Sequence, residues 1–169
     1  MANLNISYGL DRRGLLAGFA ALLPAHAASS APAPCPAADV LFICPSGTVK
    51  SAIAREMLSR RARERGVAVH AWSRGLLVED HLSAALAAKL QTDGVNPRAE
   101  PARALAPTDL ERAGTVVVFD EAAKAPGLER ARVWDIPGFL SDYDGARAGL
   151  APRIEALLDE LQARPCRER

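Results

Sequence analysis

The sequence predicts an α/β domain built on a parallel sheet flanked by helices. Four short apolar or β-branched runs, at residues 40–43, 67–72, 115–119 and 132–136, alternate with segments of helical periodicity. The first run is continuously apolar, which is typical of a strand buried on both faces. Because strands separated by helices form parallel sheets through right-handed crossovers, we expect a four-stranded parallel sheet with ligands at the carboxyl ends of its strands.

The helices are indicated by spacing and by end signals. Segments 51–66 and 82–92 carry apolar residues three and four positions apart, and a glycine or an Asp-Gly pair ends each. Residues 108–111 form a capping box, which predicts the start of a short helix. The last helix has an apolar stripe over residues 150–161, and Pro152 is expected in its first turn.

Residues 1–27 are predicted to be a twin-arginine signal peptide, which would direct export to the periplasm. Arg12 and Arg13 precede an apolar stretch that is shorter than the about 20 residues of a transmembrane helix. An amphipathic helix of a cytosolic protein is the alternative, but the stretch has no polar face. A lipid anchor at Cys35 fits poorly after Pro-Ala-Pro. Residues 28–38, rich in Ala, Pro and Ser, predict a disordered leader.

Residues 39–164 then form a single domain. The chain has 21 Lys and Arg against 20 Asp and Glu, and this balance argues against a dedicated binder of nucleic acid or of membrane surfaces. No repeat or second-domain linker is visible in the sequence. We therefore expect a monomer without stable membrane insertion once the signal is removed.

The chain has three cysteines. Cys35 precedes the first strand and Cys166 follows the last helix, and these two ends lie on the same edge of an open α/β sheet. Paired cysteines are expected in an oxidising compartment, so the positions predict a Cys35–Cys166 disulfide with Cys44 as the free thiol. The alternative is a pair of unpaired terminal thiols.

The segment from Cys44 to Ser51 lies between the first strand and the first helix. A cysteine beside a helix N-terminus and a cation favours the thiolate, and Lys50 supplies the cation. Converging backbone N–H groups there can hold a tetrahedral oxyanion. The expected phosphate-binding residues are Pro45, Ser46, Gly47, Thr48, Val49, Lys50 and Ser51.

Two other interpretations of this segment are open to test. One is an ordinary loop in which Cys44 is a small, inert, buried side chain. The other is a nucleotide-binding loop, because Lys50-Ser51 follows the first strand in the register of Gly-x4-Gly-Lys-Ser. Cys44 and Val49 occupy the two glycine positions, which argues against ATP or GTP binding.

The order strand, Cys-x5-basic, Ser, helix resembles the catalytic loop of the low-molecular-weight protein tyrosine phosphatases and, more distantly, of their arsenate-reductase relatives. The resemblance continues over about residues 39–161, through Ser51-Ala52-Ile53-Ala54-Arg55-Glu56, Trp72-Ser73-Arg74-Gly75, Asp93-Gly94-Val95, Ala102-Arg103, Val116-Val117-Val118-Phe119-Asp120 and Trp134-Asp135-Ile136-Pro137. It implies a flavodoxin-like three-layer sandwich. It also implies phosphomonoester hydrolysis through a cysteinyl-phosphate on Cys44, without a cofactor.

The sequence departs from the family in two catalytic places. The family has Arg where this chain has Lys50, and Lys offers a point charge instead of a bidentate clamp. The family also has an Asp after Ile-Pro that protonates the leaving group, and Gly138 stands there. Asp135 is the candidate replacement acid, with Asp142 and Asp144 as alternatives, although turn and capping roles suit each of them.

Two functions follow from these residues. Cys44, Gly47 and Ser51 favour a weakened phosphatase that acts on a phosphorylated substrate. The changes at Lys50 and Gly138 favour a catalytically inactive pseudophosphatase that binds an inorganic oxyanion or a phosphoprotein.

Two further functions are argued against. Thioredoxin-coupled arsenate reduction needs further cysteines near the third strand, where the chain has Asp120-Glu121. His70 and His81 lack the spacing of metal ligands, so no metal is expected and both are interpreted as surface residues.

Overall fold

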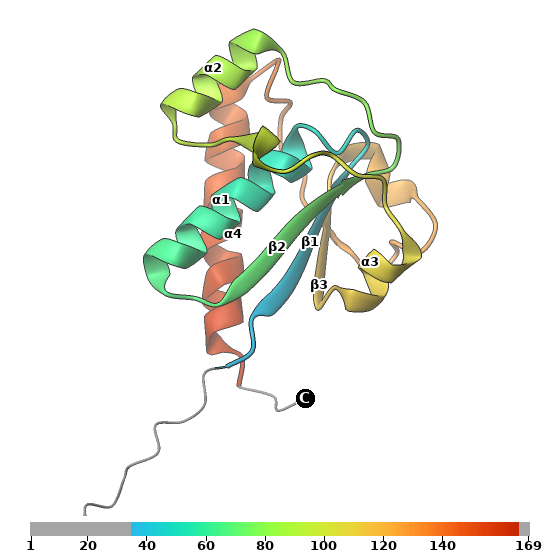
Figure 1. Cartoon of the computed structure of the whole chain (residues 1–169), viewed down its shortest axis with the longest axis vertical. Coiled ribbons are helices and arrows are strands. Elements are labelled where there is room, and N and C mark those ends of the chain that lie inside the picture. The colour runs from blue at the N-terminus through green and yellow to red at the C-terminus, as the bar shows by residue number, and fades with distance from the viewer. Residues whose placement is uncertain (1–34, 166–169) are drawn as a thin grey trace, which may run out of the picture. The chain divides into compact units, whose positions relative to one another are not determined.

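The computed structural model describes residues 35–165 (Figure 1). The predicted signal peptide, most of the predicted leader and Cys166 lie outside these residues. The signal peptide, the leader and the Cys35–Cys166 disulfide therefore stay predictions. Within residues 35–165, no helix combines the length and the apolar character needed to cross a membrane.

The fold is a sheet of four parallel strands, as the sequence predicts. The strands are β1 (Ala38–Cys44), β2 (Val69–Gly75), β3 (Thr115–Val118) and β4 (Arg132–Val133), in the order β2-β1-β3-β4. β2 ends later and β4 ends earlier than the apolar runs predict. The strand order reverses between β1 and β3, so the end of β1 at Cys44 lies where a ligand is expected.

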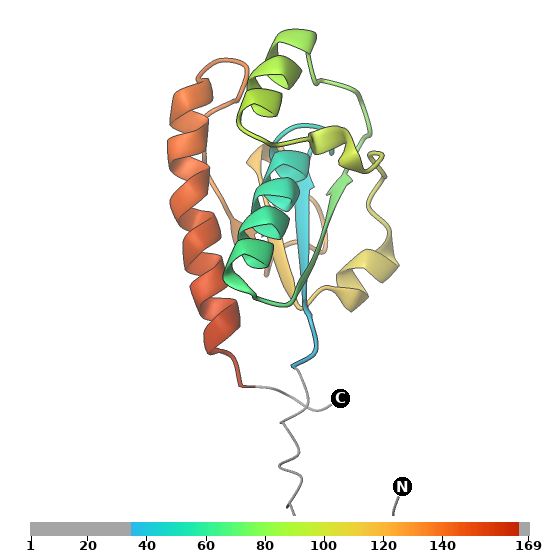
Figure 2. The ribbon, with the colours of Figure 1, turned by 60° about the vertical axis from the view of Figure 1, so that its left-hand side comes forward.

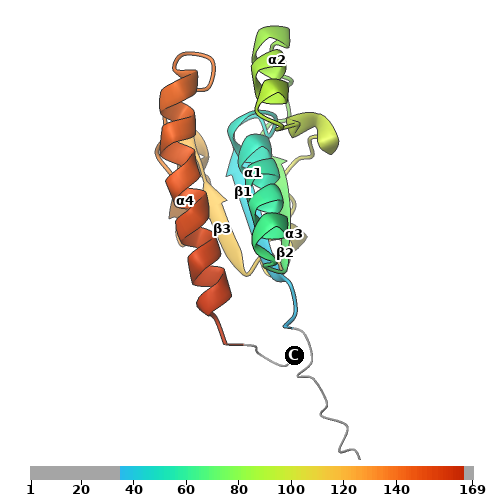
Figure 3. The same cartoon turned by 90° about the vertical axis from the view of Figure 1, so that its left-hand side faces the viewer.

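Helices cover both faces of the sheet. On one face, α1 (Lys50–Arg65) and α4 (Tyr143–Ala163) lie side by side (Figures 2 and 3). The larger core lies there, and it includes α2 (Ala84–Thr92). On the other face, a smaller core packs under α3 (Pro107–Arg112) and the 3₁₀ helix η2 (Asp120–Lys124). A second 3₁₀ helix, η1 (Pro97–Ala99), contacts α1.

β1 is the centre of both cores. All but its first two residues are buried, and alternate side chains point to opposite faces. Val40, Phe42 and Cys44 join the larger core, whereas Leu41 and Ile43 join the smaller one. This double burial explains the continuous apolar run, and it confirms that β1 is an interior strand.

The last helix begins earlier than the sequence pattern predicts. α4 starts at Tyr143, where the Asp142 carboxylate accepts a hydrogen bond from the Gly145 N–H at 2.9 Å. Pro152 therefore lies inside the helix, and its predicted place in the first turn is wrong. Pro152 and Ala148, the residue four positions earlier, are both exposed. Water can reach the Ala148 carbonyl that loses its helical donor, which makes the proline tolerable there.

The predicted capping box at residues 108–111 is also wrong. α3 begins at Pro107, and the Asp109 carboxylate accepts the Ala106 N–H at 3.0 Å. Proline suits the first helical position because its fixed φ is already helical and it lacks only an N–H that would be unpaired. Asp109 also accepts hydrogen bonds from Trp72 Nε1 at 3.1 Å and from Arg74 Nε at 2.8 Å, so it joins α3 to β2.

Candidate active site

Cys44 lies at the end of β1, 2% exposed, and lines a cavity of about 330 Å³. Its Sγ is 3.0 Å from Ser51 Oγ and accepts the Gly47 N–H at 3.2 Å. Ser51 is fully buried in the first turn of α1, so its hydroxyl is held beside the sulfur. Hydrogen bonds of this kind stabilise negative charge on sulfur, as a nucleophilic thiolate requires.

The loop after Cys44 presents backbone donors that have no acceptor. Within residues 35–165, the N–H groups of Ser46, Thr48, Val49 and Lys50 donate to no protein group. They lead into the N-terminus of α1, whose dipole favours an anion. Pro45 has no N–H, so it can shape the loop but cannot donate to a bound oxyanion. The remaining donors suit a tetrahedral anion.

The shape of this loop depends on a close approach of two glycines. Gly47 has φ +74°, and a Cβ built on it would lie 2.7 Å from the Gly75 N atom and 2.9 Å from its Cα. Gly75 ends β2 and donates its N–H to the Arg103 carbonyl at 3.0 Å. Two residues further on, Leu77 donates its N–H to the Pro45 carbonyl at 3.0 Å. The end of β2 therefore supports the loop from outside.

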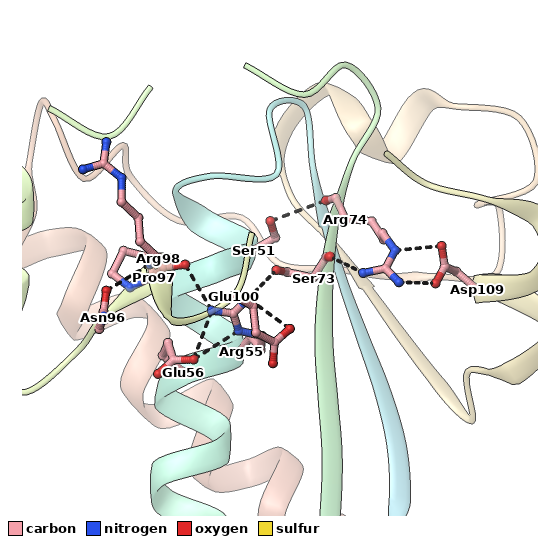
Figure 4. A network of polar contacts seen from close by, with 10 residues as sticks. All are labelled: Ser51, Arg55, Glu56, Ser73, Arg74, Asn96, Pro97, Arg98, Glu100 and Asp109. Atoms are coloured by element: carbon pink, nitrogen blue, oxygen red, sulfur yellow. Dashed lines mark hydrogen bonds and ion pairs between the residues drawn. The ribbon is translucent and has the colours of Figure 1, made fainter. Parts of the chain in front are cut away.

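A buried polar network fixes the elements around the loop (Figure 4). The Arg55 guanidinium, 1% exposed on α1, donates to Ser73 Oγ of β2 at 3.2 Å and to the Pro97 carbonyl of η1 at 3.0 Å. Arg55 also pairs with Glu56 at 3.0 Å. These contacts tie α1, β2 and η1 together, so the loop is held in one geometry before any ligand binds.

Lys50 is held in the wall of the cavity. Its Nζ lies 2.5 Å from Asp120 Oδ1 and donates to the Ile136 carbonyl at 2.8 Å. Asp120 begins η2, two positions after the end of β3, and has φ +54°. Two of the three N–H groups of the Lys50 ammonium already have acceptors, and its charge is paired with Asp120, so an oxyanion in the loop would compete with Asp120 for that charge. The sequence analysis missed this pair, although the edge shared by β1 and β3 could have indicated it.

The predicted acids do not line the cavity. Asp135 is exposed, Asp142 caps α4, and Asp144 is exposed in the first turn of α4. In the part of the chain that the structure describes, the carboxylates that line the cavity are Glu79 and Asp120. The loop before α4 contributes Gly138, Phe139 and Leu140 to the wall.

The segment after β2 brings a histidine and a carboxylate to the cavity. Thr48 Oγ1 donates to the Glu79 carbonyl at 2.9 Å and accepts the His81 N–H at 3.2 Å. Glu79 Oε2 lies 2.8 Å from His81 Nε2, and both residues line the cavity. His81 is exposed, as predicted for a surface residue, but its place in the lining of the Cys44 cavity was not predicted. The segment after β2 shows no helical or strand periodicity in its sequence from which the position of His81 could have been predicted.

Within residues 35–165, no group of three His, Cys, Asp or Glu side chains is arranged to hold a metal ion. The site therefore consists of a cysteine, backbone donors, an ion pair and a histidine–carboxylate pair around one cavity.

Solved structures with the same fold include proteins described as a low molecular weight protein tyrosine phosphatase and as a thioredoxin-dependent arsenate reductase. YfkJ from Bacillus subtilis is 15% identical with a TM-score of 0.60, over 75% of this chain and 95% of its own. A low molecular weight protein tyrosine phosphatase from T. tengcongensis is 19% identical with a TM-score of 0.53, over 75% of this chain and 98% of its own. A thioredoxin-dependent arsenate reductase from Corynebacterium glutamicum is 23% identical with a TM-score of 0.58, over 75% of this chain and 62% of its own.

At these identities the structural likeness shows the fold. No curated protein sequence matches the chain. The family profile described as "Low molecular weight phosphotyrosine protein phosphatase" matches residues 39–151, which include β1, the Cys44 loop and the start of α4. The chain therefore belongs to the low molecular weight phosphotyrosine protein phosphatase family.

Proposed function

We propose that this protein is a slow cysteine-dependent phosphatase that hydrolyses phosphomonoesters of the phosphotyrosine type. Membership of the family supports a phosphatase-like hydrolase. The observation that carries the proposal is the position of Cys44 Sγ, 3.0 Å from Ser51 Oγ and 3.2 Å from the Gly47 N, beside a loop whose other N–H groups are free.

The reaction has two steps at phosphorus. The Cys44 thiolate attacks the phosphorus, an S–P bond forms, and the bond from phosphorus to the ester oxygen breaks. Water then attacks the cysteinyl-phosphate, the S–P bond breaks, and inorganic phosphate leaves with the thiolate restored. In both steps the loop N–H groups hold the non-bridging oxygens, where negative charge concentrates.

The walls of the cavity suit an aryl leaving group. Val49, Leu77, Phe139 and Leu140 provide apolar side chains around Cys44. An aromatic ring attached to the phosphate would bury apolar area against them. This lining supports an aryl phosphate over a small polar phosphate ester.

Two features support slow turnover. Lys50 binds Asp120 and the Ile136 carbonyl, so its charge is partly neutralised before the substrate arrives. Gly138 offers no proton to the leaving group, and a positioned general acid contributes about 10²–10⁴ in rate. Arsenate reduction coupled to thioredoxin has no support in the chain, because the cysteines besides Cys44 stand at positions 35 and 166.

The test is the release of p-nitrophenol from its phosphate by the reduced protein. Cys44→Ser should lower the rate to the uncatalysed level, and vanadate should inhibit the wild type. Ser51→Ala should slow turnover about tenfold or more, because it removes a donor to the sulfur. Ser59→Ala, on the same helix but away from the cavity, is the matched control and should have no effect.

Two results would contradict the proposal. Turnover that survives Cys44→Ser would exclude the cysteine mechanism. Vanadate binding without turnover in any variant would make the protein an oxyanion-binding relative and not an enzyme.

We further propose that residues 1–27 direct export by the twin-arginine route and that the mature protein is a periplasmic monomer closed by a Cys35–Cys166 disulfide. The composition and the positions of the terminal cysteines support this. Replacing Arg12 and Arg13 with lysine should keep the protein in the cytoplasm. Export that is unchanged by this replacement would contradict the proposal.

A further inference from the structure

A phosphatase must supply a proton to a leaving group that is a weak acid. The ester oxygen departs as an anion unless a nearby acid protonates it while its bond to phosphorus breaks. The chain has Gly138 at the place where an acid was expected, and Asp135, Asp142 and Asp144 do not line the cavity. The proton must therefore come from another group.

Five ionisable side chains line the cavity in the described part of the chain: Cys44, Lys50, Glu79, His81 and Asp120. Cys44 is the nucleophile. Asp120 Oδ1 already accepts a hydrogen bond from the Lys50 ammonium at 2.5 Å, so this carboxylate is engaged as an acceptor within the cavity wall. An imidazole both gives and takes a proton near neutral pH, which singles out His81.

The surroundings of His81 suit this role. Glu79 Oε2 lies 2.8 Å from His81 Nε2, so the carboxylate holds the ring through this nitrogen and leaves Nδ1 for the substrate. Asp80 lies between these two residues in sequence but pairs with Arg98 at 2.6 Å. The His81 side chain is 54% exposed, so it can exchange protons with water between turnovers.

The position of the pair is coupled to the nucleophile loop. Thr48, four residues after Cys44, binds the backbone on both sides of Asp80 through the Glu79 carbonyl and the His81 N–H. Leu77 binds the Pro45 carbonyl through its N–H. Three hydrogen bonds therefore join the segment that carries His81 to the loop that follows Cys44, and this fixes the two segments relative to each other, as a concerted step requires.

We propose that His81, assisted by Glu79, is the general acid and base of the reaction. As the S–P bond forms, His81 Nδ1 gives its proton to the ester oxygen, and the alcohol leaves. The neutral imidazole then takes a proton from the attacking water as its oxygen bonds to phosphorus and the S–P bond breaks. The imidazolium and the Cys44 thiolate are restored. This assignment rests on the proposed phosphatase function.

The test compares two leaving groups. Phenyl phosphate needs the proton because phenol is a weak acid, whereas p-nitrophenol leaves with little help. His81→Asn should lower kcat/KM for phenyl phosphate about 100-fold and for p-nitrophenyl phosphate less than about threefold. It should also remove the alkaline limb of the pH–rate profile. Glu79→Gln should also lower kcat/KM selectively for phenyl phosphate, by a smaller factor than His81→Asn.

Two controls isolate the effect. His70→Asn changes the other histidine of the described domain, which lies at the opposite end of β2 beside Asp39 and should change neither rate. Inhibition by vanadate should be equal in the wild type and in His81→Asn, because the oxyanion loop is intact. Equal vanadate inhibition with a selective loss on phenyl phosphate supports the proposal.

The failures can be told apart. Cys44-dependent turnover in which His81→Asn slows both substrates equally, or neither, overturns the role of His81 and leaves the phosphatase standing. The absence of any Cys44-dependent turnover overturns both proposals.

Discussion

Two glycines near the site, Gly47 in the loop after Cys44 and Gly138 in the wall of the cavity, differ in what their surroundings allow. Gly47 has φ +74°, and an added Cβ would meet backbone atoms of Gly75 at 2.7 and 2.9 Å. Backbone cannot rotate away from such a clash. At Gly138, an added Cβ would meet only Ser141 Oγ, at 2.9 Å, and that side chain can turn. The fold demands glycine at position 47, whereas position 138 can accept a side chain.

This difference between Gly47 and Gly138 distinguishes the Cys44 loop from the part of the cavity wall that contains Gly138. The half that holds the sulfur, where we propose that an oxyanion binds, is fixed by backbone packing between β2 and the Cys44 loop. The half expected to carry an acid has instead an unhindered glycine with Phe139 and Leu140. The missing acid is therefore a change of side chain in an intact frame.

The largest effect is expected from Gly47→Ala. The left-handed backbone and the clash with Gly75 should together cost about 2 kcal/mol or more in the free energy of unfolding. Distortion of the loop should weaken vanadate inhibition at least about 100-fold. The measurements are denaturant unfolding and inhibition of p-nitrophenol release.

Gly66→Ala is the matched control for this variant. Gly66 also has positive φ, +66°, but an added Cβ there would meet nothing within 4 Å. It should lose about 1 kcal/mol of stability and keep its activity. Equal vanadate inhibition of the wild type and Gly47→Ala would show that the loop does not need this glycine.

Gly138→Asp should place an acid at a position in the cavity wall that can accept a side chain. The side chain fits if Ser141 rotates, and in the His81→Asn background it should raise kcat/KM for phenyl phosphate about 10- to 100-fold. Gly138→Asn has the same shape but no acidic proton, and it should give no gain. Stopped assays of phenol release check both variants. Equal gains in the two variants would mean that shape and not proton transfer limits the rate.

Lys50→Arg should raise turnover about tenfold. A guanidinium can keep one nitrogen on Asp120 while its other nitrogens bind the phosphate, and its planar fork can bind two oxygens at once, which a compact ammonium cannot do. Asp120→Asn should tighten vanadate binding severalfold by releasing Lys50, and asparagine tolerates the positive φ of this position. Weaker vanadate binding in both variants would contradict the competition between Asp120 and the anion.

The sequence predicts the placement of the Cys44 loop between β1 and α1 because the determinants of this loop are local. β1, the Cys44 loop and the first turn of α1 form a continuous segment, and the apolar run, Gly47 and Ser51 each specify one feature of it. The order of strands and helices similarly predicts the four-stranded parallel sheet.

The remaining features depend on contacts between distant segments. Lys50 and Asp120 are seventy positions apart and meet because β1 and β3 are neighbours. Glu79 and His81 lie in an irregular segment whose position is set by Thr48. The start of α4 was misplaced because Pro152 marks a helix start in sequence, although solvent exposure makes it acceptable inside this helix.

Asp109→Ala should have the smallest effect on activity and a clear effect on stability. Burial raises the pKa of the Asp109 carboxyl, but hydrogen bonds from Arg74 and the Ala106 N–H outweigh it, so the pKa lies below its usual value. Removing the carboxylate leaves Arg74 and Trp72 without their partner and should cost about 3 kcal/mol near neutral pH. Glu111→Ala, an exposed neighbour, should cost less than about 0.5 kcal/mol.

The pH dependence has a defined sign. Because the folded pKa of Asp109 is lowered, its contribution is complete above the ordinary pKa of 3.8 and is lost as the pH falls through the folded value. The difference in unfolding free energy between wild type and Asp109→Ala should therefore shrink below about pH 4. A difference that grows in acid would contradict this assignment.

The most direct test of the account is to trap the covalent intermediate. The reduced protein is mixed with an aryl phosphate, quenched within the first turnover under alkaline denaturing conditions, and digested for mass spectrometry. The account predicts one phosphoryl group on the peptide that contains Cys44, absent from Cys44→Ser and from samples with vanadate. Release of the phenol with Cys44 unmodified, or with the phosphoryl group on another residue, would contradict it.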